Sequence, residues 1–385
     1  MLERTFHVPY TQRVLFTRGV FDHGNPLLRE LLAAARDGAR PTKVLAFIDS
    51  QVAEANPELT DNLRNFAGKN ADVLTLVSNP VILAGGEACK NDFPLVEQCW
   101  GAINEASLDR HSFVFAIGGG ALLDLACFAA ATAHRGIRHV RFPTTTLSQG
   151  DGGVGVKNGV NYFGKKNWIG SFSVPYAVVN DFAFLDTLPS REKRCGLIEA
   201  IKVSLIRDGA FFAWLEQHAD DLAALQRDIV EQTVQRSAEL HVEHIATNGD
   251  PFEQGSARPL DFGHWAAHKL EQATNFTVAH GEAVAIGMAV DLVYSVHAGI
   301  LDAATVRRVL KLIEHIGFRT FAPELLARDA RGGLTILAGL EEFREHLGGE
   351  LSVTLVPEIG RKIEVHEMKT DWIVAAVEQL RDHAF

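Results

Sequence analysis

The stretch FVFAIGGGALLDLACFAAATAHR, residues 113–135, decides the fold of this chain. Its first five residues are a continuous apolar run, which is typical of a strand buried on both faces of a sheet. Gly118, Gly119 and Gly120 follow, and the rest has the composition of a helix. A strand, a glycine turn and a helix in this order can cradle a phosphate, because glycine lets a ligand approach the backbone and a helix N-terminus favours an anion. The same pattern also fits a plain tight turn, so both interpretations stay open at this point.

Strand and helix signals alternate on both sides of this stretch. Residues 90–106 have a helical pattern, and short apolar runs predict further strands at 43–49, 72–78 and 139–143. Alternation at these lengths is typical of a mostly parallel sheet with helices on both faces. The sequence therefore predicts an N-terminal α/β domain.

The pattern changes after about Leu188. From there to about residue 345 almost every segment has the helical period. Near the end, LSVTLVP and KIEVHE predict a small pair of strands, and a final helix is expected from about Thr370. The sequence therefore predicts two domains, an α/β domain over residues 1–188 and a mainly helical domain over residues 189–385.

The charge balance limits the function. Lys plus Arg is 37 and Asp plus Glu is 48, which gives a formal net charge of -11. This balance argues against a general nucleic-acid binder, because a phosphate backbone requires a basic face. A small anionic substrate remains compatible with it, since a local group of lysines can outweigh the global sign.

The cysteines, the first residues and the length of the apolar stretches indicate the compartment. The chain has 4 Cys, none in a CxxC motif, and their apolar surroundings predict buried free thiols, which fit a reducing compartment. The first residues do not have the pattern of a signal peptide. No apolar stretch reaches the ~18 residues of a membrane span. We expect a cytoplasmic protein with no membrane partner.

Residues 143–170, PTTTLSQGDGGVGVKNGVNYFGKKNWIG, form a long stretch with little periodicity. Long irregular segments in compact domains are usually functional. Lys157, Lys165 and Lys166 with Asn167 make it locally positive inside an acidic protein. This composition predicts a site for a sugar phosphate or a similar anion. The alternative is a solvated surface loop.

The helical half carries candidate metal ligands. Glu199 and Lys202 lie three apart and interrupt an apolar helix, so they are expected to be buried together. His264 and His268 lie four apart on one helix face, and His280 opens another apolar helix. One Glu with two or three His forms a plausible catalytic Zn²⁺ set with an open position.

Not every histidine pair is expected to be a site. The chain has 16 His, so pairs at helical spacing arise by chance. His241 and His244 form such a pair on a helix of mixed polarity. We predict that these two are surface residues.

Taken together and in this order, five segments resemble the sugar phosphate cyclases, the superfamily typified by 3-dehydroquinate synthase. They are GGGALLDLACFAAATAHRGI, PTTTLSQGDGGVGVKNGVNYFGKKNWIG, LPSREKRCGLIEAIK, LDFGHWAAHKLE and HGEAVAIGM. The resemblance runs from about Asp49 to the His280 motif. It implies an α/β fold in which an N-terminal Rossmann-like NAD domain with a parallel sheet precedes a mainly α-helical, metal-binding domain.

The resemblance also implies roles for individual residues. NAD would contact Asp49, Glu87, Lys90, Gly119, Gly120, Asp124, Thr144 and Thr145. Zn²⁺, or Co²⁺ in its place, would be bound by Glu199, His264 and His280. The catalytic groups would be Asp151, Lys157, Lys202 and His268, and the substrate would also contact Arg135, Lys166, Asn167 and Asp261. His268 thereby leaves the ligand set, and Arg135 would reach the phosphate held by the neighbouring subunit of a homodimer.

The chemistry that the resemblance implies is a lyase reaction with recycled NAD. A ring hydroxyl of a sugar phosphate is oxidised by NAD⁺ while the metal polarises its oxygen. Phosphate then leaves by β-elimination, the hydride returns, the ring opens, and an intramolecular aldol reaction closes a carbocycle. NAD⁺ is regenerated in each turnover.

Departures from the 3-dehydroquinate synthase pattern indicate the substrate. The family Arg that binds the substrate carboxylate falls on Ala257, with Arg258 one place away, and the Lys that shares that carboxylate falls on Glu243. The family Asn near the phosphate falls on Asp261, and a C-terminal Lys falls near Ser352. Glu243 would repel an acid by like charge, so an uncharged polyol end suits this pocket better.

The substrate that fits is sedoheptulose 7-phosphate, which the valiolone-type cyclases convert to 2-epi-5-epi-valiolone or 2-epi-valiolone. The alternatives are 3-dehydroquinate synthesis and other cyclase reactions, including that of 2-deoxy-scyllo-inosose synthase. A metal-dependent alcohol, polyol or glycerol dehydrogenase shares the architecture but would lack the GDGGVGVKNGVNYFGKKN segment and would release NADH. A non-catalytic scaffold is poorly motivated, since the chemical groups are all present.

Overall fold

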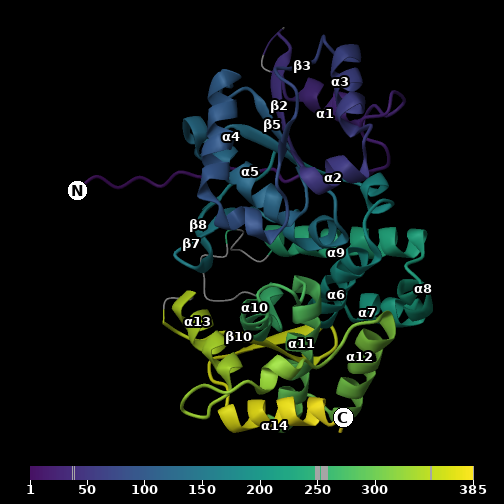
Figure 1. Cartoon of the computed structure of the whole chain (residues 1–385), viewed down its shortest axis with the longest axis vertical. Helices are drawn as coiled ribbons and strands as arrows, with labels where there is room; N and C mark the ends of the chain where they lie inside the picture. The colour runs from purple at the N-terminus through teal and green to yellow at the C-terminus, as the bar shows by residue number, and fades with distance from the viewer. Residues whose placement is uncertain (37, 39, 248–251, 253–258, 347–348, 385) are drawn as a thin grey trace. The chain divides into compact units, whose positions relative to one another are not determined.

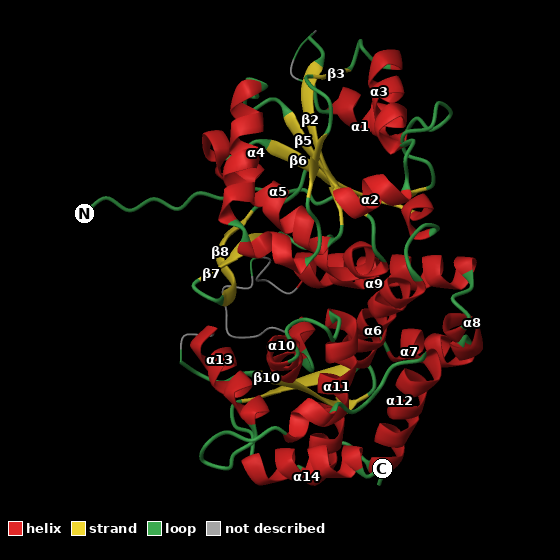
Figure 2. Ribbon diagram, viewed as in Figure 1, coloured by secondary structure: helices red, strands yellow, loops and turns green. Residues whose placement is uncertain are grey.

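The computed structural model describes the whole chain except residues 37, 39, 248–251, 253–258, 347, 348 and 385 (Figure 1). The chain divides into two compact units, Met1–Leu188 and Pro189–Phe385. The first unit has a sheet with helices and the second is mainly helical (Figure 2). The predicted fold class is therefore confirmed. Within the described residues, no helix has the length and apolar character that crossing a membrane requires.

The first unit is built on a parallel sheet in the order β1-β9-β6-β5-β2-β3, with β4 pairing β2. The strands are β1 Val14–Thr17, β2 Thr42–Asp49, β3 Leu74–Leu76, β4 Val81–Leu83, β5 Phe113–Gly118, β6 Arg138–Pro143 and β9 Ala177–Asp181. Each strand pair described in this sheet is parallel. The strands predicted at 43–49, 113–117 and 139–143 are confirmed, and the one predicted at 72–78 is the shorter β3.

Helices cover both faces of this sheet, as a run of buried residues in the central strand requires. They are α1 Leu27–Ala34, α2 Ser50–Ala55, α3 Leu59–Lys69, α4 Phe93–Glu105 and α5 Gly120–Thr132, with the short helices η1 Glu87–Asn91, η2 Ala133–Arg135, η3 Ser148–Gly152 and η4 Phe182–Leu185. Phe113, Phe115 and Ile117 of β5 enter one apolar cluster. Val114 and Ala116 enter the other. Strand β5 is therefore buried on both faces, and Gly119 and Gly120 follow it at the start of α5.

A hairpin occupies much of the stretch that was expected to be irregular. Strands β7 Lys157–Tyr162 and β8 Lys165–Phe172 pair antiparallel. Phe163 and Gly164 between them both have positive φ, 51° and 70°, which is the geometry of a tight hairpin turn. The many Gly, Lys and Asn residues hide the strand alternation, so the sequence pattern did not reveal this element.

The second unit packs its helices around two, α6 and α11, that are buried over most of their length. The helices are α6 Ser190–Arg207, α7 Gly209–Gln217, α8 Ala219–Ala223, α9 Arg227–Thr247, α10 His264–Ala273, α11 His280–His297, α12 Ala303–Ile316, α13 Ala338–His346 and α14 Thr370–Arg381. The short helices are η5 Pro259–Asp261, η6 Pro323–Leu326 and η7 Thr335–Leu337, and β10 Val353–Glu358 pairs antiparallel with β11 Arg361–Val365. The buried stretch of α11 is almost entirely apolar, and that of α6 is apolar apart from a few residues, chiefly Glu199 and Lys202. The predicted strand pair and final helix are confirmed.

The four cysteines are free and buried, as predicted: Cys89, Cys99, Cys127 and Cys195. Burial raises the pKa of Cys89, Cys99 and Cys195 to about 12 and that of Cys127 to about 11. These thiols therefore stay protonated near neutral pH and are poor nucleophiles.

Candidate functional site

Three helices of the second unit bring a carboxylate and two imidazoles together. Glu199 lies in α6, His264 begins α10 and His280 begins α11. The Oε1 atom of Glu199 lies 4.0 Å from Nε2 of His264 and 3.8 Å from Nε2 of His280. One oxygen and two nitrogens at these separations can close around one ion. The donor set fits a catalytic Zn²⁺ site, which has three protein ligands and one open position.

Glycines allow these three helices to approach so closely. A Cβ atom on Gly287 of α11 would lie 2.0 Å from the carbonyl oxygen of Gly263, and one on Gly281 would lie 2.4 Å from the carbonyl oxygen of Cys195 in α6. Gly263 itself has φ +77°, a left-handed conformation that favours glycine, directly before His264. The glycines therefore fix the positions from which both histidines project.

Both histidine rings are held through Nδ1, which leaves Nε2 for a ligand. Nδ1 of His264 lies 3.0 Å from the carbonyl oxygen of Phe262, and Nδ1 of His280 lies 3.1 Å from Oε2 of the buried Glu271. A proton on each Nδ1 makes these two hydrogen bonds and sets the tautomer that binds a metal through Nε2. Glu271 follows His264 by two turns on the same face of α10, but a lone helical acid gives no sign of this role in the sequence.

A second group of ligand-type atoms overlaps the first: His268, Glu271 and His280 also lie close together. The hydrogen bond from His280 to Glu271 explains this proximity without a second ion. The ring of His268 lies 5.5 Å from that of His264 and 6.0 Å from that of His280, between ring centroids. The structure thus places His268 beside the three-residue set, where a group that acts on a bound substrate could lie.

Lys202 and Glu199 form a buried ion pair, with side chains only 2% and 1% exposed. Lys202 Nζ contacts Oε2 of Glu199, and Oε1 is the atom that faces the histidines. A buried carboxylate needs such a partner, because an unpaired charge in an apolar interior is costly. The expectation that these two residues are buried together is confirmed.

The prediction that His241 and His244 are surface residues is wrong. Both are buried, and Nδ1 of His244 lies 2.5 Å from Nη1 of Arg207 in α6. They continue the buried stripe of Val234 and Ala238 along α9, which packs against α6. Their polarity conceals that stripe in the sequence, because a buried helix face is normally marked by apolar residues.

In the first unit, the glycines after β5 have two different roles. A Cβ atom on Gly118 would lie 2.6 Å from a side-chain carbon of Leu122, so packing requires this glycine. A Cβ atom on Gly119 would meet only Thr145, at an ordinary 3.5 Å, and one on Gly120 would meet nothing within 4 Å. Gly119 and Gly120 therefore leave an open backbone at the start of α5, which a phosphate could approach.

Two polar groups border this open backbone. Thr144 Oγ1 is buried and has no hydrogen-bond partner in the described part of the chain, which a bound ligand would explain. Asp49 is buried at the end of β2, where Oδ1 accepts from the backbone N–H of Gln51 at 2.9 Å. Burial raises the pKa of the Asp49 carboxyl, while backbone donors including Gly119 oppose the rise. These residues fit a dinucleotide of the kind that the sequence predicts.

A connected polar network joins η1, α5 and the hairpin. Lys90 Nζ donates to Asp124 Oδ2 at 2.7 Å and also contacts the side-chain oxygen of Asn167. Asn161 links Asn167 to Glu87, because its Oδ1 accepts from the backbone N–H of Asn167 at 2.8 Å and its Nδ2 donates to Glu87 at 3.2 Å. Burial disfavours the charge of Lys90, but the nearby carboxylates of Asp124 and Glu87 raise its pKa. Predicted cofactor residues and a predicted substrate residue thus lie together.

Arg141 organises the stretch between Asp151 and Lys157. Its guanidinium is fully buried and donates to the carbonyl oxygens of Gly153, Gly155 and Lys157 at 3.0, 2.8 and 2.9 Å. The sequence gives no sign of this role, because an Arg in a strand usually points to solvent. The loop that carries the predicted catalytic groups is therefore built on a buried charge.

The other predicted residues have more exposed positions. Asp151 lies in η3, Lys166 lies in β8 and Asp261 lies in η5, each partly exposed, while Lys157 and Arg135 are exposed. Glu243 is exposed on α9. Ala257 and Arg258 lie outside the described residues.

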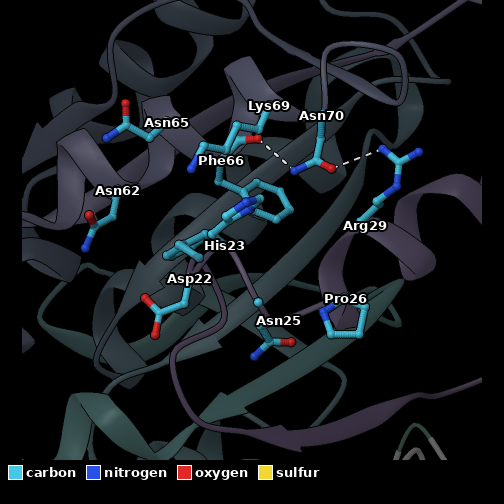
Figure 3. A pocket seen from close by; sticks show the side chains of 12 residues that line it. Asp22, His23, Asn25, Pro26, Arg29, Asn62, Asn65, Phe66, Lys69 and Asn70 are labelled. Carbon is cyan, nitrogen blue, oxygen red and sulfur yellow. Dashed lines mark hydrogen bonds between the residues drawn. The ribbon is translucent and has the colours of Figure 1, made fainter.

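A separate cavity in the first unit contains none of these groups (Figure 3). It has a volume of 480 Å³ and lies between the turn after β1 and helix α3, lined by Phe21, His23, Asn62, Phe66 and Lys69 among others. Because it lies away from the glycines and from the polar network, we do not assign the chemistry to it.

Comparison with known proteins identifies the family. The 3-dehydroquinate synthase N-terminal model matches residues 80–195 and the C-terminal model matches residues 196–332. A 3-dehydroquinate synthase of Geobacter sp. (strain M21) is 43% identical over 257 residues, 66% of this chain and 70% of that protein. A 2-epi-5-epi-valiolone synthase of Streptomyces glaucescens is 36% identical over 359 residues, 93% of this chain and 87% of that protein. This chain belongs to the sugar phosphate cyclase superfamily.

A solved structure of high similarity supports the same family membership. The 2-epi-5-epi-valiolone synthase from Streptomyces hygroscopicus subsp. jinggangensis 5008, with NAD⁺ and Zn²⁺ bound, has a TM-score of 0.86 and 27% identity, and the match covers 99% of this chain and 100% of that chain. The family expected from the five segments is confirmed. Membership of this family indicates that the cyclase is an enzyme of lyase type.

Proposed function

We propose that this cyclase converts sedoheptulose 7-phosphate to a valiolone-type C7 cyclitol, 2-epi-5-epi-valiolone or 2-epi-valiolone, and releases phosphate. The observation that carries the proposal is the acidic side chain of Glu243, at the position where a family Lys would bind a substrate carboxylate. Ala257 replaces the Arg partner of that Lys, which supports the same choice. The valiolone synthase of Streptomyces glaucescens matches more of the chain than the more identical Geobacter protein does.

We propose NAD and one Zn²⁺ or Co²⁺ as cofactors. The residues that would hold the metal are Glu199, His264 and His280, and those that would hold NAD are Asp49, Glu87, Lys90, Gly119, Gly120, Asp124, Thr144 and Thr145. When bound, NAD supplies a hydride acceptor that is restored within each turnover, and the metal supplies a Lewis acid for the ring hydroxyl. The open Gly119 backbone, the buried Thr144 hydroxyl and the three convergent donors support this assignment.

The chain's own residues would bind and orient the substrate. Lys157, Lys166 and Asn167 of the hairpin provide charge and hydrogen bonds for the phosphate. Lys202 and His268 lie beside the metal ligands and would hold or move a proton at the ring oxygens, and Asp151 and Asp261 would accept from hydroxyl groups. Acceptors of this kind suit a polyol, which offers many O–H donors.

We also propose a homodimer in which Arg135 reaches the phosphate of the neighbouring subunit. Arg135 is exposed at the end of η2 and has a left-handed φ of 63°. Strained positions of this kind are often functional.

One specific observation favours a second candidate, 3-dehydroquinate synthesis. Arg258 stands next to Ala257, and the Geobacter relative is a 3-dehydroquinate synthase. An incubation with sedoheptulose 7-phosphate and NAD⁺ tests the proposal, read by phosphate release, by absorbance of NADH and by NMR of the product. We expect phosphate and a cyclitol without net NADH. Net NADH would indicate a polyol dehydrogenase, and an inert mixture would exclude this substrate.

A further inference from the structure

Asp291 is a fully buried carboxylate of α11 that has no part in the chemistry described so far. Its Oδ2 accepts a hydrogen bond from the backbone N–H of Gly263 at 3.0 Å, and its Oδ1 accepts one from the indole N–H of Trp265 at 2.8 Å. These two partners are the residues directly before and after His264. One carboxylate therefore holds the chain on both sides of a proposed metal ligand.

The position of Asp291 is costly for a carboxylate. Burial raises the pKa of the Asp291 carboxyl to about 7, while the hydrogen bonds from Trp265 and Gly263 oppose the rise. Gly263 is the N-cap residue of α10, so the carboxylate also lies at a helix N-terminus, which favours a negative charge. An apolar residue would avoid the cost of burial altogether, which points to a task for Asp291 beyond filling space.

Both partners of Asp291 lie where α10 packs closely against α11 (Figure 2). A Cβ atom on Gly263 would lie 2.6 Å from the backbone nitrogen of Met288, so the two backbones touch at this point. Gly287, which provides the space on α11, precedes Asp291 by one turn on the same helix face. Trp265 is only 1% exposed, so packing prevents its indole from turning away. The two hydrogen bonds thus add direction to a contact that is already close.

The position of the His264 imidazole depends on this contact. Its Nδ1 is held by the carbonyl oxygen of Phe262 at 3.0 Å, which fixes the rotation of the ring. The place from which the ring projects is set by the backbone at residues 263–265, which Asp291 holds. Nε2 then lies 4.0 Å from Oε1 of Glu199. A ligand that is held in place before the ion binds loses less conformational freedom on binding, which favours a higher affinity.

We propose that Asp291 is a positioning residue for the metal site, which holds Gly263 and Trp265 and thereby fixes His264 in the geometry that binds the ion. The inference rests on the proposed metal site, and it does not depend on which sugar phosphate the cyclase uses. The role requires two acceptor oxygens. An Asn side chain has one, so at position 291 it would keep one hydrogen bond and turn its NH₂ group toward the other donor.

The Zn²⁺ affinity of the full chain, measured at pH 8 in competition with a chelator, tests this role. We expect Asp291→Asn to bind Zn²⁺ 10–100-fold more weakly than the wild type, as for other groups that orient a metal ligand. Trp265→Phe, which keeps the hydrogen bond from Gly263, should show a smaller loss. The control is Tyr294→Phe, which removes a buried hydroxyl of α11 that accepts from the N–H of Lys369, and its affinity should stay within twofold. Asp291→Asn within twofold of the wild type would overturn the proposal.

A double variant separates positioning from a general loosening of the fold. In Asp291→Asn with Trp265→Phe, the amide oxygen can accept from Gly263 and no indole donor faces the NH₂ group. We therefore expect the double variant to bind Zn²⁺ at least as tightly as Asp291→Asn alone, with circular dichroism verifying that each variant is folded. A loss equal to the product of the two single losses would overturn the proposal. If Asp291→Asn does not fold, an unchanged affinity in Trp265→Phe would overturn it.

The wild-type measurement distinguishes this inference from the proposed metal site on which it rests. A wild-type chain that binds no Zn²⁺ would contradict the metal site, and the positioning role with it. A wild-type chain that binds one Zn²⁺ as tightly as its Asp291→Asn variant does would leave the metal site in place and contradict the positioning role alone.

Discussion

Nε2 of His280 lies 3.8 Å from Oε1 of Glu199, while Nδ1 of the same ring lies 3.1 Å from Oε2 of Glu271. One imidazole thus joins two buried carboxylates. This arrangement is that of a metal-ligating histidine whose far nitrogen is held by a carboxylate. The two carboxylates therefore have different proposed tasks: Glu199 binds the ion and Glu271 orients its ligand.

Replacing His264 by Ala should abolish stoichiometric metal binding. His264 contributes one of three proposed donors, and a site with two protein ligands holds Zn²⁺ far more weakly. Elemental analysis of the purified variant measures this directly. His297→Ala serves as the control, because His297 lies at the end of α11 and bonds to Gln379. One zinc per chain in the His264 variant would exclude the proposed site.

Removing the Glu271 side chain should weaken metal binding without removing a ligand. Loss of a carboxylate behind a ligating histidine typically costs 10–100-fold in affinity. We expect Glu271→Ala to show such a loss in competition with a chelator, and Glu271→Gln, which keeps an oxygen acceptor, to show a smaller one. The matched control is Glu342→Gln. Glu342 lies in α13 and forms an ion pair with Lys269, which is on the same helix as Glu271. Equal affinity in wild type and Glu271→Ala would remove Glu271 from this role.

Gly119→Val should weaken NAD⁺ binding while leaving the fold intact. The added side chain would project over the open backbone at the start of α5, and the described neighbours leave room for its Cβ. We expect at least a tenfold higher Kd by calorimetry, or about 1.4 kcal/mol. Gly101→Val, on the exposed side of α4, controls for the general effect of valine in place of glycine. An unchanged Kd would mean that the pyrophosphate does not approach this backbone.

The stability of the first unit should fall in mild acid because of His139. Burial, followed by the nearby Arg141 charge, lowers the pKa of His139 from 6.5 to about 3. Below pH 6.5 His139 becomes protonated in the unfolded chain but stays neutral in the folded chain, so the free energy of unfolding decreases as the pH falls toward 3. Between pH 7.0 and 5.5 this one group should lower the free energy of unfolding by about 1 kcal/mol. The free energy of unfolding in urea should depend less steeply on pH in His139→Gln than in the wild type. The same pH dependence in both proteins would contradict the assignment to His139.

The sequence predicted best where apolar period and residue chemistry coincide. The buried run of β5, the glycines after it and the ion pair of Glu199 with Lys202 all follow from local pattern. Long-range packing was less accessible. His241 and His244 are buried because α9 packs against α6, and Arg141 is buried because a loop folds over it. No pattern within a single element specifies contacts of that kind.

The hairpin and Glu271 show a different limit. Strand alternation in β7 and β8 is masked by the residues proposed to bind phosphate and by turn residues, including Gly164 with its positive φ. Glu271 looks like an ordinary helical acid until His280, from another helix, is placed 3.1 Å away. Functional requirements override local propensity at such positions, so structure is needed to find them.

Competition between sedoheptulose 7-phosphate and 3-deoxy-arabino-heptulosonate 7-phosphate at equal concentration tests the central claim most directly. The absent Arg and Lys would contribute roughly 3–6 kcal/mol toward a carboxylate, counting about 1.5–3 for each bond to a charged group. At about 1.4 kcal/mol per decade, the acid should be disfavoured by about two to four decades in kcat/KM. We therefore expect a valiolone-type cyclitol as the main product by NMR. Preferential formation of 3-dehydroquinate would contradict the proposal and assign this chain the activity of 3-dehydroquinate synthase.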